Sequence, residues 1–540
     1  MWIIPFYCLL GNPGIDTEIS YQYHGFVNKT NISYLAAGIE HEKFSGPDNV
    51  ITNLAYDSRS VKKGSLFFTM PGIHTDGHNF ILTAIDKGAA GIVHSLPIDT
   101  PVQGISYIQV KDPRTALSPI SAIFYDHPSK KMHTIGVTGT DGKSTTVYFI
   151  YQLLTLLGEK AGFLSTVNYL SSGNTIRKNP FRQSTPEASE IHGILRDMAD
   201  NGKEYAVIEA TSHGLSAKNN RLGDVSFDTA VFTNITHEHL EFHGSFEDYR
   251  KDKVRLFHML DREDDSKGKR FGVINKDDPN FGYFQQGTHK PVYSYSTAED
   301  KEADLYGEIE SSDIYGTSFG LYYKGHNNSA YLPLPGLFHV EDLLAAALTV
   351  CALFDCPISR LIPYFGDLKP VPGRFQPVRM GQPFSVFIDY AHTPGSFKKL
   401  LPKVKSWTPG RLIVVFGSAG ERDFEKRSLQ GRIADEIADT IILTDEDPRG
   451  ETPEDILRDI QRGCSRKKEG LDLFCITDRK EAINKAFSLA RKDDTVLLLG
   501  KGHESSIIYS SGPIDWNEKE TAEGLLKDRR FYQINDGNPL

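Results

Sequence analysis

Short apolar runs alternate with amphipathic stretches along most of the chain, and this alternation predicts an α/β fold. Between residues 49 and 128, the runs GSLFFTM, GAAGIVHS and GISYIQV accompany the helical pattern HNFILTAIDKGA. Apolar runs of this length between turn residues are typical of buried strands. This part of the chain is therefore predicted to form a small α/β domain.

Two longer series follow. Strand candidates HTIGVTG, EYAVIEA, DTAVFTNI and RFGVINK are separated by helical stretches, and FSVFIDY, RLIVVFG, DTIILTD, LDLFCIT and DTVLLLG follow LKPVPGR. Such alternation predicts doubly wound, mostly parallel sheets, the second of them Rossmann-like. We predict an N-terminal extension over residues 1–45 and domains over residues 46–130, 131–370 and 371–540.

Composition narrows the class of protein. A chain of 540 residues is too long for one hydrophobic core. The net charge of -10 argues against nucleic acid or an anionic membrane as the main partner. The five cysteines show no CxxC spacing, so neither a disulfide framework nor a zinc site is indicated, and a cytoplasmic setting fits best.

The first ten residues, MWIIPFYCLL, are the one hint of targeting. They are too few to span a bilayer, and no basic residue precedes them. An extension that packs on the first domain or is disordered is the better interpretation. No other segment approaches membrane length, so we expect no membrane insertion.

The stretch IGVTGTDGKSTT, residues 135–146, predicts a phosphate-binding loop. Its three glycines follow a buried strand and precede a helix, where backbone N–H groups and the helix dipole favour an anion. Lys143 can reach terminal phosphates, and the hydroxyl of Ser144 or Thr145 can meet a magnesium ion. The alternative is a glycine-rich turn with a chance lysine. Position 137 holds valine where the general P-loop has glycine, so this is a variant loop.

This variant resembles the ATP loop of the Mur ligase family, and further motifs agree with the MurE members in order. They are DSRSVKKGSLFFTMPGIHTDGH (57–78), STPEA (184–188), IEATSHGL (208–215), TNITHEHLEFHGSFEDYRKDKVRLF (233–257), INKDD (274–278), PVPGRFQPV, DYAHTP, FGSAGERDFEKR, TDEDPRGETP and GKGHE. The resemblance covers roughly residues 50–525.

The resemblance implies an ATP-dependent amide ligase of peptidoglycan synthesis. MurE ligases add a diamino acid to UDP-N-acetylmuramoyl-L-alanyl-D-glutamate, and ATP first converts the acceptor carboxylate to an acyl phosphate. Phosphoryl transfer needs positive charge around the moving phosphate, supplied by a lysine and Mg²⁺, and Lys143 fits the first role. A cytoplasmic monomer without nucleic-acid partners is expected.

The same resemblance implies the metal site. Glu209, at the end of EYAVIEA, can give magnesium an oxygen ligand, and His239 would lie near the metal. Lys253 would be carbamylated, which needs a neutral, partly buried amine, and Lys251 is the solvated alternative. Without the resemblance, Glu209 would be a loop-capping carboxylate and His239 a surface histidine. The expected metal site is Ser144, Glu209, His239 and carbamylated Lys253.

The resemblance also implies, residue by residue, which positions of this chain contact the substrates. The expected ATP contacts are Thr138, Gly139, Thr140, Asp141, Gly142, Lys143, Ser144, Thr145, Arg374 and Asp389. The expected contacts to the UDP substrate are Ser58, His74, Thr75, Gln183, Ser184, Thr185, Thr211 and Arg221, since hydroxyls and guanidinium groups suit anions. His339 and Asp342 replace two family asparagines near the adenine, which puts their contact to ATP in doubt.

The amino-acid site is expected at Arg422, Glu446, Asp447, Pro448, Arg449, Gly500 and Glu504. The family pattern for meso-diaminopimelate is Asp-Asn-Pro-Arg, whereas this chain has a carboxylate at 447. That charge favours the terminal ammonium of lysine or ornithine. Arg449 argues the other way, because it could pair with the extra carboxylate of diaminopimelate.

Two rival interpretations stay open. One is another ligase of the same superfamily, of the MurF or folylpolyglutamate synthetase type, although STPEA and GKGHE disfavour both. The other is a non-catalytic nucleotide-binding relative, against which Lys143, Glu209, His239 and Lys253 argue.

Overall fold

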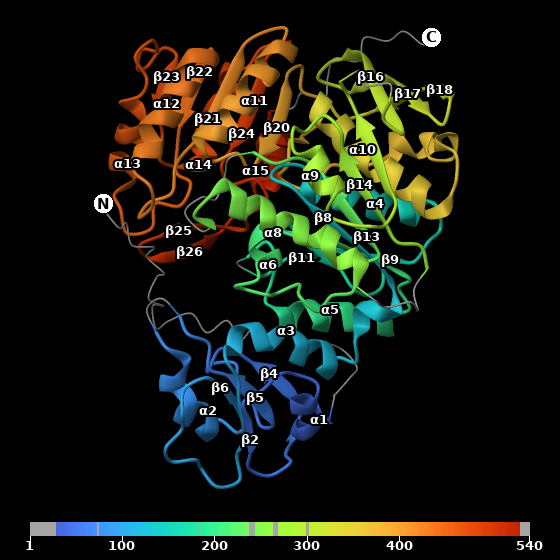
Figure 1. The fold of residues 1–540 in the computed structure, drawn as a ribbon. Coiled ribbons are helices and arrows are strands. Elements are labelled where there is room, and N and C mark those ends of the chain that lie inside the picture. The colour runs from blue at the N-terminus through green and yellow to red at the C-terminus, as the bar shows by residue number, and fades with distance from the viewer. Residues whose placement is uncertain are drawn as a thin grey trace. The chain divides into compact units, whose positions relative to one another are not determined.

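The computed structural model describes residues 29–72, 75–181, 183–236, 243–262, 268–298 and 302–529 (Figure 1). The chain divides into two units. Unit 1 holds residues 1–296, 300–304 and 344–356, and unit 2 holds residues 297–299, 305–343 and 357–540.

The N-terminal region of unit 1 is built on a five-stranded sheet. Its order is β2 (Lys43–Ser45), β7 (Ser106–Gln109), β6 (Ala89–His94), β5 (Ser65–Phe68) and β4 (Asn53–Ala55), and β2 alone runs antiparallel to its neighbour. Alternate residues of β5 face two cores: Leu66 and Phe68 lie in one, and Phe67 lies in the other. The other elements are β1 (Thr30–Asn31), β3 (Val50–Ile51), α1 (Ile32–Ala37), η1 (Gly77–Phe80), α2 (Ile81–Asp86), α3 (Pro113–Phe124) and η2 (Pro128–Lys131).

The central sheet of unit 1 is mostly parallel. Its order is β11 (Arg177–Lys178), β10 (Asn168–Leu170), β9 (Ala161–Leu164), β12 (Tyr205–Glu209), β8 (His133–Thr138), β13 (Thr229–Phe232), β14 (Phe271–Asn275) and β15 (Val292–Ser296). Among these strands, the β9–β10 and β10–β11 pairs are antiparallel. The helices are α4 (Lys143–Leu156), α5 (Ala188–Asp200), α6 (Ser212–Leu215), α8 (Phe246–His258), η3 (Met259–Asp261) and α9 (Phe281–Gln285). This doubly wound sheet confirms the predicted class.

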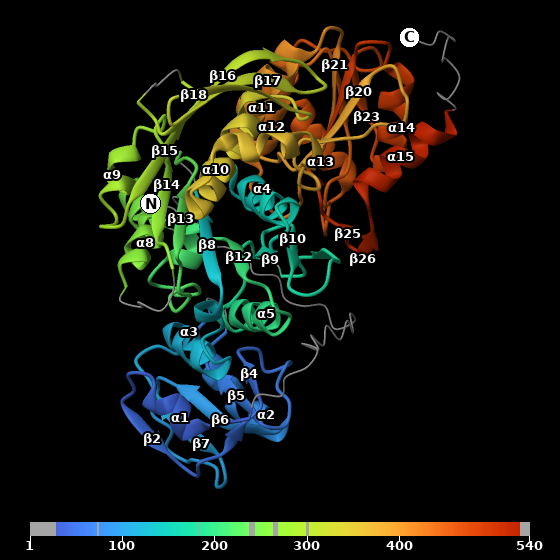
Figure 2. The same cartoon turned by 90° about the vertical axis from the view of Figure 1, so that its right-hand side faces the viewer.

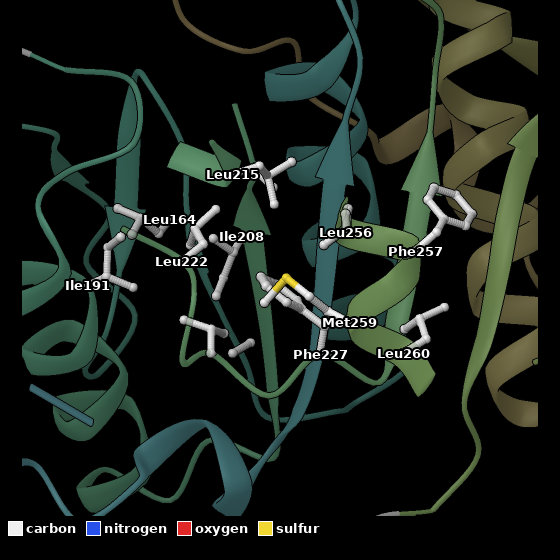
Figure 3. Close-up of a cluster of buried hydrophobic side chains, with 14 of the residues drawn as sticks. Leu164, Ile191, Ile208, Leu215, Leu222, Phe227, Leu256, Phe257, Met259 and Leu260 are labelled. Atoms are coloured by element: carbon white, nitrogen blue, oxygen red, sulfur yellow. The ribbon is translucent and has the colours of Figure 1, made fainter. Parts of the chain in front are cut away.

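Figure 3 shows a buried cluster between this sheet and its helices, with Ile208 on β12 and Leu256 on α8 among its members. The cluster explains why position 136, inside β8, is a glycine. A Cβ at Gly136 would come within 2.6 Å of Leu256 and 2.8 Å of Phe227. Gly136 is therefore needed for core packing, and the turn from β8 into α4 follows the end of the strand at Thr138.

Helices α3 and α5 pack against each other, and both views show them side by side (Figures 1 and 2). Helix α3 follows the last strand of the N-terminal sheet, and α5 covers the central sheet. Asp112 caps the first turn of α3 and Glu187 that of α5. This helix pair joins the two sheets of unit 1.

Unit 2 contains an antiparallel meander and a second doubly wound sheet. The meander is β16 (Leu305–Ser312), β17 (Thr317–Tyr323) and β18 (His326–Leu332), which the sequence analysis did not predict. The sheet has the order β19 (Gln376–Pro377), β20 (Ser385–Asp389), β24 (Thr495–Leu499), β21 (Leu412–Phe416), β22 (Thr440–Leu443) and β23 (Leu473–Cys475), with only β19 antiparallel.

The remaining elements of unit 2 are η4 (Ile358–Arg360), η5 (Ile362–Asp367), α11 (Pro394–Trp407), α12 (Glu425–Ile437), α13 (Pro453–Gln461), α14 (Arg479–Leu489), α15 (Glu518–Asp528) and the hairpin β25 (Ser506–Tyr509)–β26 (Gly512–Asp515). Leucine, isoleucine and valine side chains of β21, β22 and β24 fill two cores, one on each face of the sheet. Strands covered on both faces read as continuous apolar runs, which is the pattern in the sequence.

Helix α10 (Leu337–Phe354) corrects one expectation. Within the described residues it is the one helix long and apolar enough to cross a membrane by length and composition, although no segment beyond the N-terminus was expected to be. However, 72% of it is buried inside the fold. A core helix of a globular protein passes the same test, so α10 is weak evidence for a membrane span.

Candidate active site

The glycine loop lies between β8 and α4, as the sequence predicts. Gly142 has a φ of +82° immediately before the first residue of α4, a conformation that favours glycine. A Cβ on Gly139 would lie 1.9 Å from Thr233 Oγ1, so a side chain does not fit there. Both glycines let the chain turn tightly from strand to helix.

The chain after β13 holds this loop. Asn234 accepts the Thr140 N–H through its carbonyl at 2.7 Å and the Asp141 N–H through Oδ1 at 3.0 Å. Thr233 Oγ1 donates to the Asp141 carbonyl at 2.7 Å. Two loop N–H groups therefore have protein acceptors. The N–H groups at the start of α4 lack partners within the helix and remain the candidates for binding an anion.

Three expected ATP contacts lie at the start of α4. Lys143 Nζ donates to the Thr140 carbonyl at 2.7 Å, and Ser144 Oγ donates to Glu209 Oε2 at 2.8 Å. Thr145 is buried. Thr138 is buried at the end of β8, and its hydroxyl has no hydrogen-bond partner among the described residues.

Glu209 ends β12 and is only 3% exposed. Besides Ser144, it accepts the Thr166 N–H on Oε2 and the Thr166 hydroxyl on Oε1, each at 2.8 Å. Thr166 is not among the site residues expected from the sequence. A carboxylate and a hydroxyl in hydrogen-bond contact offer the hard oxygen ligands that Mg²⁺ prefers.

Lys253 is 1% exposed on α8. Its Nζ donates to the Gly139 carbonyl at 2.5 Å and lies 4.6 Å from the centroid of the Tyr249 ring. The Tyr249 hydroxyl lies 3.1 Å from Thr140 Oγ1. The buried amine is thus fixed against the glycine loop, while the side chain of Lys251 is 59% exposed. Of the two lysines, Lys253 is the one in surroundings suited to modification.

Several residues expected to bind the UDP substrate gather where β12 ends. Thr185 Oγ1 lies 2.8 Å from Thr211 Oγ1 and donates to the Glu209 carbonyl at 3.1 Å. Arg221, 7% exposed, donates to the Thr185 carbonyl at 3.1 Å and pairs with Glu187 at 2.9 Å. Gln183 is exposed and Ser184 half-buried beside them.

The expected uridine contacts lie in the N-terminal region. Ser58 follows β4, and its carbonyl accepts from Lys87 at 3.1 Å. Thr75 is exposed before η1. His74 and His239 both lie outside the described residues, so their expected roles stay predictions.

In unit 2, Arg374 and Asp389 come together at the start of the doubly wound sheet. Asp389 accepts the Phe375 N–H at 2.7 Å and the Ala391 N–H at 2.8 Å. Burial raises the pKa of Asp389, although the positive charge of Arg374 acts to lower it. The Arg374 guanidinium lies 4.9 Å from the centroid of the Tyr390 ring.

The two departures from the family pattern, His339 and Asp342, are buried on α10, 2% and 6% exposed. His339 Nδ1 is 2.8 Å from the Pro335 carbonyl, and burial lowers the pKa of His339 to about 4. His339 is therefore neutral near pH 7.

The expected amino-acid residues come from three segments of unit 2, which follow β21, β22 and β24. Glu446, Asp447 and Pro448 are buried after β22, and Arg449 has a positive φ of +57° and donates its N–H to the Ile508 carbonyl at 2.8 Å. A Cβ at Gly500 would lie 2.8 Å from Glu446 Oε2. Gly500 therefore leaves room for the Glu446 carboxylate. Arg422 is exposed.

A residue outside the expected set organises these carboxylates. Lys501, 0% exposed, donates to Asp447 Oδ1 at 2.8 Å and to Glu504 Oε2 at 2.6 Å. The Ile508 N–H also donates to Asp447 Oδ1, at 3.0 Å. By contrast, Glu446 Oε2 has no hydrogen-bond partner among the described residues. The lysine in GKGHE was the available signal, but the sequence does not show what it pairs with.

Three family models match the chain in order: "Mur ligase family, catalytic domain" over residues 50–125, "Mur ligase middle domain" over residues 137–350 and "Mur ligase, glutamate ligase domain" over residues 373–502. Among curated proteins, the UDP-N-acetylmuramyl-tripeptide synthetase of Borreliella afzelii is 47% identical, over 89% of this chain and 94% of its own length. The chain belongs to the Mur ligase family, within its MurE type.

Other relatives agree. The tripeptide synthetase of Treponema denticola is 46% identical over 89% of this chain and 95% of its own. A UDP-N-acetylmuramoyl-L-alanyl-D-glutamate–2,6-diaminopimelate ligase of Clostridioides difficile is 35% identical over 91% of this chain and 98% of its own length. The solved structure of a UDP-N-acetylmuramoyl-L-alanyl-D-glutamate–2,6-diaminopimelate ligase matches with a TM-score of 0.63 and 25% identity. The match covers 93% of this chain and 99% of that one. These relatives identify the chain as a ligase and set aside the non-catalytic alternative.

Proposed function

We propose that this MurE-type ligase uses ATP to join a diamino acid to UDP-N-acetylmuramoyl-L-alanyl-D-glutamate in cytoplasmic peptidoglycan synthesis. The observation that carries the proposal is the arrangement at the glycine loop, where Lys143, Ser144 and Glu209 face one turn. The names of relatives 44–47% identical support the same reaction. The protein is proposed to act as a monomer.

The chemistry proceeds in two steps. A carboxylate oxygen of the D-glutamate residue attacks the γ-phosphorus of ATP, and the bond to ADP breaks, which leaves an acyl phosphate and ADP. The α-amine of the diamino acid then attacks the acyl carbon, phosphate leaves and the amine loses a proton. Lys143 stabilises the charge on the moving phosphoryl group.

Magnesium fits the oxygen groups at this turn. Ser144 and Glu209 would hold it, together with His239 and carbamylated Lys253, and the ion would neutralise phosphate charge. The contact of 2.8 Å between the Ser144 hydroxyl and the Glu209 carboxylate places two such oxygens side by side. For Lys253, burial supports carbamylation, because burial favours the neutral amine that reacts with carbon dioxide.

We further propose which ligand each domain binds. Residues 46–130 bind the uridine end through Ser58, His74 and Thr75, and residues 131–370 hold ATP and the muramoyl peptide. Residues 371–540 bind the amino acid, with Arg374 and Asp389 contributing to ATP. Residues 1–45 come first in the sequence, and among them α1 and β2 pack with the N-terminal sheet.

The amino acid is proposed to be lysine or ornithine. Support comes from Glu446, whose buried Oε2 lacks a partner and suits an ammonium group. Asp447 and Glu504 add two carboxylates against the single charge of Lys501. The opposing feature is Arg449, whose buried Nε also lacks a partner among the described residues and could take a carboxylate.

Phosphate release tests the ligase proposal. With ATP, magnesium, UDP-muramoyl-dipeptide and lysine all present, we expect stoichiometric ADP, phosphate and tripeptide. Omission of any one component should stop product formation. With ¹⁸O in the D-glutamate carboxylate that forms the amide, one labelled oxygen should appear in the released phosphate. Unlabelled phosphate would contradict the acyl phosphate.

A further inference from the structure

The first turn of α5 connects the N-terminal and central regions of unit 1 through two carboxylates. Glu187 is the N-cap of this helix, and Glu190 is its third residue. Glu190 accepts from the Tyr56 hydroxyl, and Tyr56 lies one residue after β4 and two before Ser58. The chain that leads to the expected uridine contacts is therefore bonded to α5.

The bonds continue toward the expected muramoyl and diphosphate contacts. Glu190 Oε2 accepts the Glu187 N–H at 2.7 Å, and Glu187 Oε1 pairs with Arg221 at 2.9 Å. Arg221 then donates to the Thr185 carbonyl at 3.1 Å. The Arg221 Nε is buried without a partner among the described residues. An orphaned guanidinium N–H beside Thr185 is a group that an anionic ligand can satisfy.

A second branch runs back to the N-terminal region. Arg114 of α3 lies 3.9 Å from Glu187 Oε1, and it donates to the Pro71 carbonyl at 3.2 Å. Glu187 thus faces one guanidinium from each region. Burial of Glu187 and Arg221, 8% and 7% exposed, makes their pairing sensitive to small displacements.

We propose that Glu187 and Glu190 are positioning residues that keep the uridine end and the muramoyl end of the substrate site in register, Glu190 through Tyr56 and Glu187 through Arg221 and Arg114. The inference rests on the proposed UDP-linked substrate. Such a substrate is held at two ends, so a change in spacing weakens its binding and leaves the ATP chemistry intact.

The alternative is that the cluster only stabilises the fold. The capping box of Glu187 and Glu190 does not require the contact with Tyr56. Here the Tyr56 contact spans 134 residues and two sheets, and it buries a carboxyl whose pKa burial raises to about 7. Substrate length distinguishes the two roles, since a purely structural contact would affect long and short substrates alike.

The test compares Tyr56→Phe with Tyr34→Phe, an exposed tyrosine of the same region. The substrates are UDP-N-acetylmuramoyl-dipeptide and 1-phospho-N-acetylmuramoyl-dipeptide, which lacks the uridine end. We expect Tyr56→Phe to raise KM for the UDP substrate roughly tenfold, with kcat, KM for ATP and KM for the short substrate unchanged. Glu190→Gln, which keeps an acceptor oxygen for Tyr56, should retain most of the affinity.

An unchanged KM in Tyr56→Phe, or equal increases for both substrates, would overturn the inference. Calorimetric binding of the UDP substrate without ATP separates this failure from failure of the ligase proposal. If the wild type binds but does not turn over, weaker binding in Tyr56→Phe still supports the positioning role. If the wild type does not bind the UDP substrate, both proposals fail.

Discussion

The glycine loop of unit 1 and the amino-acid site of unit 2 both contain ionisable side chains that are buried or half-buried, but these groups have different partners. At the loop, Lys143 and Lys253 donate to backbone carbonyls, and Glu209 accepts from hydroxyl and N–H groups. At the amino-acid site, Asp447 and Glu504 share the buried ammonium of Lys501.

This difference bears on how each site meets a charged ligand. Charges held by neutral partners keep most of their field for an incoming phosphate or metal ion. Charges already in ion pairs act on a ligand mainly through the part that is not compensated, which for Asp447, Glu504 and Lys501 is one formal negative charge. Substitutions at the loop should therefore have large effects on catalysis, and single substitutions at Asp447 should adjust selectivity.

The largest effect is expected at the loop. Lys143→Ala should lower kcat/KM by at least about 10²–10³-fold, because it removes charge next to the transferring phosphoryl group. The melting temperature should stay close to wild type, since the side chain supports no core. Steady-state phosphate release measures kcat/KM, and thermal denaturation measures the melting temperature. Near-wild-type turnover would refute the site, and Lys160→Ala, at an exposed lysine, is the control.

Lys253→Ala tests the second loop lysine. If Lys253 is carbamylated, the variant should lose roughly 10²-fold in kcat, the scale of one electrostatic contact in a closed site, and short carboxylates should restore part of the rate. Lys251→Ala, at an exposed neighbour, should remain active. Full wild-type activity in buffer free of carbon dioxide, with an unmodified amine by mass spectrometry, would count against carbamylation.

Lys501→Ala should act mainly on stability. The substitution leaves Asp447 and Glu504 without their shared cation, and breaking a buried pair from one side costs about 3–5 kcal/mol. Urea denaturation should show this loss in the free energy of unfolding, whereas Lys480→Ala, at an exposed position, should be neutral. A loss below about 1 kcal/mol would show that Asp447 and Glu504 do not depend on Lys501.

The smallest effect concerns selectivity. Asp447→Asn should shift the ratio of kcat/KM for lysine over meso-diaminopimelate toward diaminopimelate by up to about tenfold, the value of one polar contact. Lys501 already neutralises much of the Asp447 charge, so a larger shift is not expected. Rates with each amino acid alone give the ratio, and an unchanged ratio would mean that Arg449 dominates.

The sequence predicted those features that depend on neighbours along the chain. The α/β class and the doubly wound sheets are confirmed, because each buried strand shows as an apolar run. The turn from β8 into α4 is also local, since Gly139 and Gly142 both lie within it and both have a positive φ. The site roles of the residues remain predictions, although the structure now gives their partners.

Features that depend on distant partners were missed. Nothing in the periodicity shows that Lys501 reaches Asp447, 54 residues earlier, or that Tyr56 reaches Glu190. Gly136 was counted with the loop because spacing does not distinguish packing from anion binding, and the contacts of Leu256 and Phe227 decide it. Strands β16 and β18 carry many polar residues and lack the apolar runs used to find strands.

Lysine or ornithine is the amino acid that we propose this chain adds to UDP-N-acetylmuramoyl-L-alanyl-D-glutamate. A competition with lysine, ornithine and meso-diaminopimelate at equal concentrations, read by the masses of the products, tests it most directly. The account predicts that the lysine or ornithine tripeptide predominates, with one ADP formed per product. Predominance of the diaminopimelate tripeptide would contradict the choice of amino acid, and absence of all three products would contradict the ligase itself.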